Sequence, residues 1–330
     1  MTIYDIAQEA GVSASTVSRV INNKKGVNKQ TRALIEQILK KYNFEPDASA
    51  RGLVNQSSKI IGVMMSDIRT MHHAEGAYYI EQQLQKYGYN CIMMNSGFSD
   101  ASRAEGIRTL SARRAEAVVL IGSTFQSEGV KNAIKEYLDG LPVIIENGYI
   151  DLPNVYGVLA DEKNGISECV RYLLDKGKKH LVFINKEDTP SNRLKIQGFC
   201  EAIQKADAAM APNVLWLDGE DDLQTSYDAT LRLMKEQPET DGIIYTTDFI
   251  ATAGIRALVD LHLSIPEQVS VIGVDNSVYA RLSYPRLTSL DNKMEILSIT
   301  CSDILVKVLN GEQVPNKMMI FSNIVERETT

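Results

Sequence analysis

Three short segments in which apolar residues recur with helical spacing open the chain. The first covers "IYDIAQEA" (3–10), and Gly11 then supplies the left-handed residue at which such a helix ends. A second helix is capped by Ser13 or Ser15 and turns its valines inward, and a third lies within residues 29–44. Two short helices joined by a glycine-containing turn and closed by a third predict a helix-turn-helix module.

From residue 59 onward the pattern changes to short apolar runs that alternate with amphipathic stretches. The first series of runs comprises residues 60–65, 91–96, 117–122 and 142–146, and the second comprises residues 180–185, 214–217, 242–246 and 269–275. Nearly continuous apolar strands separated by helices are typical of parallel sheets that are covered on both faces. Two similar series therefore predict two doubly wound α/β lobes after the helix-turn-helix.

Polar residues end or directly follow most of these runs. Ligands of open parallel sheets bind outside the carboxyl ends of the strands, so these positions are candidates for a binding site. A single aspartate at a strand end is more often a cap or turn residue, but the recurrence in both series favours a cleft for a small polar ligand. The residues concerned are Ser66, Asp67, Asn95, Ser96, Asn147, Asn185, Thr247, Asp248, Asp275 and Asn276.

Charge is distributed unevenly between the two parts. Residues 1–59 contain nine Lys and Arg against five Asp and Glu, a net charge of +4, which leaves −11 for the rest of a chain whose total is −7. A basic head on an acidic body is suited to a polyanionic partner of the head, although a solvated charged surface would give the same balance.

Several functional classes lack support in the sequence. The four cysteines lie far apart and without metal-ligand spacing, which indicates reduced thiols and no metal site. No GxSxG, GxxxxGK[ST] or HExxH motif is present, so we expect neither an enzyme nor a cofactor. No run approaches the roughly 18 apolar residues of a membrane span, and we expect a soluble, cytoplasmic protein that does not associate with membranes.

The second helix carries the candidate base contacts, because a helix-turn-helix places the start of that helix in the major groove of DNA. Arg19 can bind guanine in bidentate fashion, Ser15 can reach a base edge, and the methyl group of Ala14 can meet that of a thymine; Ser18 faces the same way. Hydroxyl and amide donors suited to phosphates are Thr2, Tyr4, Ser13, Thr16, Asn22, Asn28 and Thr31. The alternative is a three-helix bundle without a ligand.

The stretch "TIYDIAQEAGVSASTVSRVINN" (2–23) resembles the head of the lactose-repressor (LacI/GalR) family of bacterial transcription regulators. The similarity continues through "VNKQTRALIEQILKKYNFEPDASARGL" (27–53). It implies a DNA-binding domain over residues 1–46 and a hinge helix and linker over 47–59. In this family two hinge helices pair on operator DNA. Leu53 would then wedge into the minor groove, and Ala50 is small enough to allow a close approach.

The body, residues 60–330, resembles the same family as far as "IGVDNSVYARLSYPRLTSL" (272–290). The resemblance implies a fold like that of periplasmic sugar-binding proteins, with three crossings between an N-lobe (about 60–160 and 292–320) and a C-lobe (about 161–291 and 321–330). The effector contacts that it implies fall on Asn147, Arg193, Asp248 and Asp275. We expect Arg193 and Asp275 to face each other across the cleft, with Asp67 and Asn147 opposite.

The chain departs from its relatives where they often place aromatic residues after the first strand. It has His72 and His73 there, preceded by Arg69, and it has Asp221 or Asp222 where some relatives stack an aromatic ring on the ligand. We therefore expect a hydroxyl-rich effector, a sugar or a sugar derivative such as a sugar phosphate or sugar acid, and binding of an anionic effector should weaken as the pH rises through the histidine range near ~6.5. The alternative is that both histidines are ordinary surface residues.

The expected function is a homodimeric, effector-responsive transcription repressor that binds operator DNA. Two alternatives remain. One is a free-standing sugar-binding receptor, against which the head and the absence of a signal peptide argue. The other is a regulator controlled by a protein co-regulator at the surface of the body.

Overall fold

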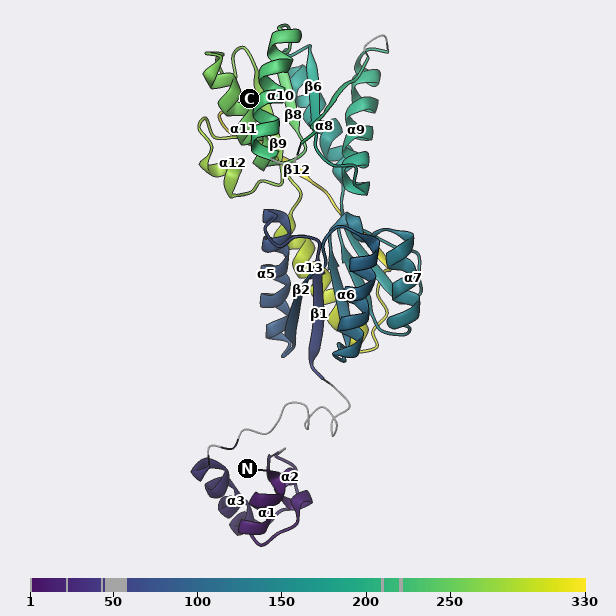
Figure 1. Ribbon diagram of the computed structural model, residues 1–330, viewed down its shortest axis with the longest axis vertical. Coiled ribbons are helices and arrows are strands. Elements are labelled where there is room, and N and C mark those ends of the chain that lie inside the picture. The colour runs from purple at the N-terminus through teal and green to yellow at the C-terminus, as the bar shows by residue number, and fades with distance from the viewer. Residues whose placement is uncertain (1, 22, 43, 45–57, 209–210, 220–221) are drawn as a thin grey trace. The chain divides into compact units, whose positions relative to one another are not determined.

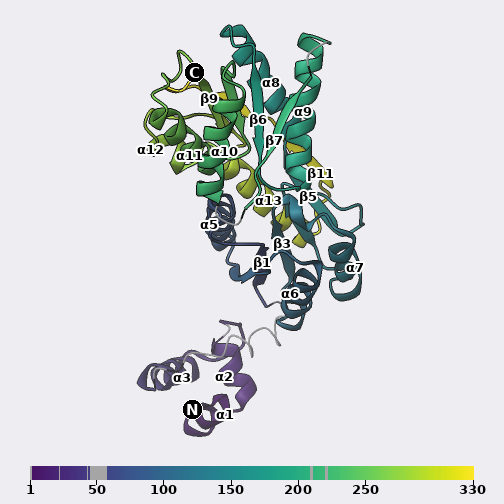
Figure 2. The ribbon, with the colours of Figure 1, turned by 45° about the horizontal axis from the view of Figure 1, so that its top comes forward.

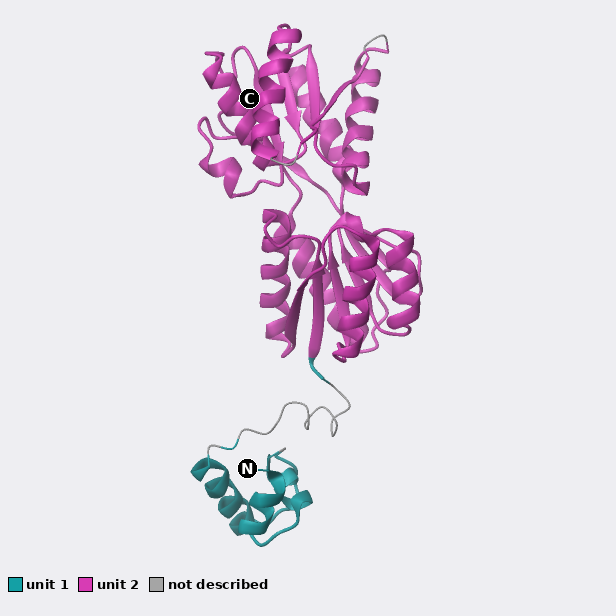
Figure 3. Ribbon diagram, viewed as in Figure 1, with its two compact units in different colours: residues 1–59 teal, residues 60–330 magenta. Residues whose placement is uncertain are grey.

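The computed structural model describes residues 2–21, 23–42, 44, 58–208, 211–219 and 222–330. The chain divides into two compact units, Met1–Lys59 and Ile60–Thr330 (Figure 3). The predicted hinge helix, with Ala50 and Leu53, and the predicted phosphate contact Asn22 lie outside the described residues.

In its described residues, the first unit, hereafter the head, contains the helices α1 (Ile3–Glu9), α2 (Ala14–Ile21) and α3 (Lys29–Lys41). Gly11 adopts a φ of +65° in the turn after α1, which is why a glycine stands there. The three helices share one small core, which includes Ile6, Ala7, Val17, Val20, Ile35 and Ile38. This is the predicted helix-turn-helix with its closing helix.

The second unit, hereafter the body, contains two sheets with helices on both faces of each (Figures 1 and 2). The sheet of the N-lobe has the order β11-β5-β4-β3-β1-β2, and all of its strand pairs are parallel. Its strands are β1 (Ile60–Met65), β2 (Asn90–Asn95), β3 (Ala117–Ile121), β4 (Val143–Glu146), β5 (Val155–Ala160) and β11 (Lys317–Ile320).

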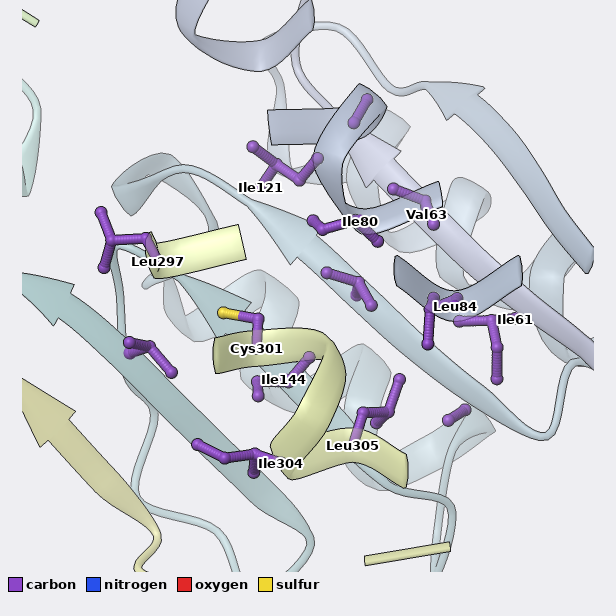
Figure 4. Close-up of a cluster of buried hydrophobic side chains, with 14 of the residues drawn as sticks. Ile61, Val63, Ile80, Leu84, Ile121, Ile144, Leu297, Cys301, Ile304 and Leu305 are labelled. Atoms are coloured by element: carbon purple, nitrogen blue, oxygen red, sulfur yellow. The ribbon is translucent and has the colours of Figure 1, made fainter. Parts of the chain in front are cut away.

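Two hydrophobic clusters cover the two faces of this sheet. Helices α5 (Met71–Lys86) and α13 (Met294–Leu309) pack on one face, where Ile80 and Leu84 of α5 meet Leu297 and Leu305 of α13 over the strands (Figure 4). Helices α6 (Asp100–Ala112) and α7 (Glu128–Tyr137) cover the other face. A short 3₁₀ helix, η1 (Ser123–Phe125), follows β3 directly.

The sheet of the C-lobe has the order β12-β10-β9-β8-β6-β7. Its strands are β6 (Leu181–Asn185), β7 (Asn213–Trp216), β8 (Gly242–Tyr245), β9 (Ser270–Val274), β10 (Thr288–Asp291) and β12 (Asn323–Val325). Its helices are α8 (Glu162–Asp175), α9 (Pro190–Ala206), α10 (Asp222–Glu236), α11 (Asp248–Asp260) and α12 (Val278–Leu282). Strand β12 pairs antiparallel with β10, so this otherwise parallel sheet has one antiparallel edge.

The fold class predicted from the sequence is confirmed. Each of the eight predicted apolar runs is a strand, and each boundary agrees to within one residue. Strands β5, β10, β11 and β12 were not predicted. The chain passes between the two sheets three times, after β5, after β10 and after β11. Among the helices in the described ranges, none combines the length and apolar character that crossing a bilayer requires.

Candidate functional site

The outer face of α2 is the candidate DNA-reading surface of the head. Ser15 and Arg19 are exposed one helical turn apart, whereas Val17 and Val20 point into the core. The two remaining predicted base contacts are half-buried beside them: Ala14 and Ser18. The guanidinium of Arg19 lies near Gly26. A Cβ atom added to Gly26 would be 3.8 Å from Nη1 of Arg19.

Several of the predicted phosphate contacts also cap the helices. The Oγ1 atom of Thr2 accepts a hydrogen bond from the Asp5 amide at 3.3 Å, and Asn28 Oδ1 accepts one from the Thr31 amide at 2.7 Å. Ser13 caps α2 in the same way. Capping uses an oxygen lone pair and leaves hydroxyl or amide hydrogens that can be donated to phosphate. The other described members of this set are exposed or half-buried: Tyr4, Thr16 and Thr31.

The head surface around α2 is strongly cationic. The sequence from Ala10 to Ile35 contains no Asp or Glu, and its five cationic residues are Arg19, Lys24, Lys25, Lys29 and Arg32. Arg32 donates to the Lys24 carbonyl oxygen at 2.8 Å and to Asn23 Oδ1 at 3.2 Å, which ties the turn after α2 to α3. This surface can neutralise several phosphates at once.

A cavity of about 740 Å³ lies between the two lobes of the body. Seven of the eight predicted effector contacts line it: Asp67, Arg69, His72, His73, Asn147, Asp248 and Asp275. They come together because the strand ends of both parallel sheets meet at this cleft. The lining also contains residues that the sequence reasoning did not select, among them Glu162, Lys186, Lys195, Phe98, Phe249 and Tyr279.

Asp67, directly after β1, is held by the residue two positions later. Arg69 donates to it through Nε at 3.0 Å and through Nη2 at 2.6 Å, and the Arg69 amide adds a further bond at 3.0 Å. These bonds lower the pKa of the Asp67 carboxyl to about 2. The exposed Arg69 guanidinium is thus paired with the Asp67 carboxylate.

The two histidines lie in the first turns of α5 and are not protonated at neutral pH. Burial is the main cause that lowers the pKa of each to about 4, and nearby Lys195 adds to the effect on His72. His73 Nδ1 lies 2.8 Å from the carbonyl oxygen of Asp67, which can only accept, so Nδ1 carries the proton. The expectation that protonated histidines attract an anion near pH 6.5 is therefore wrong. His73 Nε2 is an acceptor instead.

A buried ion pair forms the floor of the cleft. Lys195 Nζ lies 3.3 Å from Glu162 Oε1, and both side chains are almost fully buried. The same oxygen accepts from Ser191 Oγ at 2.7 Å and from Asn147 Nδ2 at 3.3 Å. Asn147 has a φ of 55° and closes the network by accepting from the Ala160 amide.

Arg193 does not line this cleft, which corrects the prediction that it faces Asp275. Its exposed guanidinium pairs with Asp188 through Nε at 2.6 Å and through Nη2 at 2.7 Å. Arg193 and Lys195 are two positions apart in α9, so they point to different sides of the helix. Lys195 is the cation that α9 turns toward the cleft and toward Asp275, whose charge it opposes.

Asp248 and Asp275 supply the acceptors of the C-lobe. Asp248, at the start of α11, accepts from Ser277 Oγ at 2.9 Å and from Ser289 Oγ at 2.6 Å, and burial raises its pKa to about 7. Asp275 has a φ of 100°, an unusual backbone conformation for a residue with a side chain. Its carboxyl accepts from Asn292 at 3.3 Å, and burial raises its pKa.

Each cationic residue in the described lining has a carboxylate partner. Arg69 pairs with Asp67, Lys195 with Glu162, and Lys186 with Asp222 at 3.1 Å. Asp222 is one of the two residues proposed in place of a stacking aromatic, and the other, Asp221, lies outside the described residues.

The aromatic rings of the cleft come from other elements. Phe249 and Tyr279, whose centroids are 5.1 Å apart, come from the C-lobe, and Phe98 comes from the N-lobe.

Comparisons with known proteins agree with both units. Residues 2–47 match the family model of bacterial regulatory proteins of the lacI family, and residues 170–330 match a periplasmic binding protein-like domain. An HTH-type transcriptional regulator of Lachnoclostridium phytofermentans is 32% identical over 332 residues, covering 100% of this chain and 99% of that protein.

Solved structures show the same fold. The lac repressor dimer bound to operator and the anti-inducer ONPF has a TM-score of 0.89 at 20% identity, covering 100% of this chain and 98% of that one. A periplasmic binding protein/LacI transcriptional regulator from Alkaliphilus metalliredigens, complexed with D-xylulofuranose, has a TM-score of 0.71 at 25% identity, covering 82% and 99%.

A helix-turn-helix head with a cationic surface around α2, joined to a two-lobed body with an interlobe cleft, defines a DNA-binding transcription regulator. The chain belongs to the LacI family of bacterial regulatory proteins. Members of this family are regulators and not enzymes.

Proposed function

We propose that the protein is a homodimeric transcription repressor whose affinity for a near-palindromic operator is set by a neutral, hydroxyl-rich ligand in the cleft. Arg19 and Ser15 would read bases, with Ala14 and Ser18 beside them, and the capping residues Thr2, Ser13 and Asn28 would position the head on phosphates. The roles proposed for Asn22, Ala50 and Leu53 rest on family resemblance. Because its target is chromosomal DNA, the protein would act in the cytoplasm.

The electrostatics of the cleft carry the ligand part of the proposal. The three Lys and Arg residues in the described lining are paired with carboxylates, and burial favours neutral histidines, so an anionic ligand would meet no uncompensated positive charge among these residues. Asp275 and the paired carboxylates offer acceptors, and His73 Nε2 adds another, which suits a ligand rich in hydroxyl donors. The family neighbour complexed with D-xylulofuranose supports a sugar as that ligand.

Strand β1 offers a route from the ligand to the DNA. It begins at Ile60, immediately after the segment that joins the head to the body, and ends next to Ser66 and Asp67 in the cleft lining. A ligand that favours one arrangement of the lobes would change the relative positions of the two β1 strands in a dimer, and with them the positions of the two heads on DNA. Such coupling is reciprocal and typically amounts to about 1–3 kcal/mol, or roughly 5- to 150-fold in affinity.

The two alternatives make different use of the molecule. A free-standing receptor would have no use for a head with five cations around its reading helix. Control by a protein co-regulator would leave the interlobe cleft without a ligand-dependent role. Neither alternative accounts for both the head and the cleft.

The DNA part is tested by selecting binding sites from random DNA with the full chain and with residues 60–330. The full chain should select paired half-sites about one helical turn apart, and residues 60–330 should select nothing. A single asymmetric half-site would contradict the dimer, and retained specific binding by residues 60–330 would contradict the role of the head.

The ligand part is tested on the full chain bound to that selected operator. Fluorescence anisotropy would follow operator affinity during titration with neutral sugars and with their matched acids, for example glucose against gluconate and glucose 6-phosphate. Neutral members should change operator affinity and acidic members should not. A response confined to the acids would overturn the neutral-ligand proposal.

A further inference from the structure

The cleft changes character from its floor to its mouth. At the floor the side chains are polar and buried: Asn147, Glu162, Lys195, Asp248 and Ser277 are each at most 6% exposed. At the mouth two apolar side chains remain accessible, Phe98 at 60% and Leu223 at 40%. They come from opposite lobes, and both line the same cavity.

Phe98 is held in place by its neighbours although it is exposed. The Ser96 amide donates to the Met65 carbonyl oxygen at 2.8 Å and the Gly97 amide donates to that of Ser66 at 3.0 Å, so this loop is bonded to the end of β1. Ser99 then caps α6. The backbone on both sides of Phe98 is thus already fixed and loses little further freedom when a ligand covers the ring, which favours binding.

The cavity is larger than one sugar ring requires. Its volume of about 740 Å³ lies in the upper half of the roughly 300–1,000 Å³ range of pockets that enclose drug-sized ligands. A single ring bonded to the floor would leave the mouth filled with water and Phe98 uncovered. The apolar C–H face of a second ring would cover that phenyl face and displace the water.

We propose that the effector contains at least two linked neutral sugar units, the first bonded to the polar floor and the second stacked on Phe98 at the mouth. This inference rests on the proposed function, because it takes the cleft ligand to be a neutral sugar. It makes Phe98 the residue that determines effector length. Phe249 and Tyr279 also line the cavity, are less exposed than Phe98, and would flank the first ring.

The experiment measures dissociation constants by calorimetry on the full chain. The probes are neutral mono-, di- and trisaccharides of hexoses and pentoses, with both α and β linkages, each compared with its constituent monosaccharide. The variants are Phe98→Ala and the control Trp216→Ala, which removes a 48% exposed aromatic residue on β7 that does not line the cleft.

A disaccharide or trisaccharide should bind at least tenfold more tightly than its constituent monosaccharide. Phe98→Ala should remove that advantage and change the affinity for the monosaccharide by less than about twofold, while Trp216→Ala should preserve it. Equal affinity for both sizes, or equal weakening of both by Phe98→Ala, would overturn the two-ring inference and leave the proposed function intact. Binding by no neutral sugar of any length would overturn both.

Discussion

The ammonium nitrogen of Lys195 lies 3.3 Å from Glu162 Oε1, and the exposed fractions of the two side chains are 6% and 2%. Removing one partner of such a pair leaves an uncompensated buried charge. We expect Lys195→Met to lower the free energy of unfolding of the body by about 3–5 kcal/mol, as measured by urea denaturation. Lys195→Met with Glu162→Gln should recover much of that loss.

The matched control for this prediction is Arg193→Met in the same helix. Arg193 pairs with Asp188 where both side chains are more than half exposed, and surface pairs contribute at most about 1 kcal/mol. A Lys195→Met variant as stable as Arg193→Met would show that the buried pair is not as important as its geometry indicates.

The buried carboxyl group of Glu146 gives a second prediction. Its Oε2 atom accepts from Ser298 Oγ at 2.6 Å, while Oε1 is buried without a hydrogen-bond partner among the described residues. Burial raises the pKa of Glu146 from 4.5 to about 7. The folded protein therefore holds this proton more tightly than the unfolded chain does, and the stability linked to it is lost as the pH rises from about 4.5 to 7.

Glu146→Gln should remove the loss of stability that ionisation of the buried carboxyl causes, because an amide of similar shape carries no charge. At pH 8 we expect the variant to unfold with a free energy up to about 3 kcal/mol higher than the wild type, and at pH 5 the difference should be small. Urea denaturation at both pH values measures this. Asp248, whose pKa is also raised to about 7, remains in the variant and gives a residual dependence of the same sign. An equal difference at both pH values would contradict the assignment.

The parts of the fold that the sequence predicted are those with a strong periodic signal. Buried central strands such as β3 and β8 are apolar at nearly every position, so their runs stand out. Strands β11 and β12 lie at sheet edges and are half-exposed, and their short sequences "KMMI" and "NIV" carry little pattern. Their pairing comes from the tertiary fold.

The candidate site was predictable in position but not in charge. Asp67, Asn147 and Asp275 follow strands, and topology brings the strand ends together. Which face of α9 meets the cleft depends on how the helix packs. In the folded protein this face contains Lys195 and not Arg193. The neutral state of His72 and His73 follows from burial, which no linear pattern contains.

An interlobe hydrogen bond gives a third prediction. The Ser191 amide, at the start of α9 in the C-lobe, donates to Ser123 Oγ in η1 of the N-lobe at 3.2 Å. Ser123→Ala should destabilise the observed arrangement of the lobes by about 1 kcal/mol, which would change effector affinity several-fold, downward if the effector favours this arrangement and upward if it favours another. Fluorescence energy transfer between labelled lobes, measured without ligand, should show a larger separation. Ser127→Ala, which removes a cap within the N-lobe, should change neither quantity.

The reading helix gives the last prediction. Arg19 is exposed on α2, and a bidentate contact to guanine would make it sequence-specific, whereas Lys25 lies in the turn after α2 and would contact phosphate only. Arg19→Ala should cost about 1–3 kcal/mol on the selected operator and relax discrimination at one base pair of each half-site. Lys25→Ala should weaken binding to all sequences alike and reduce the slope of log affinity against log salt by about 1 for each site contacted. Titrating both variants against the operator, its single-base variants and random DNA at several salt concentrations measures these effects. If Arg19→Ala weakened every sequence equally, Arg19 would be a phosphate contact, and base reading would have to be assigned to Ser15 and its neighbours on α2.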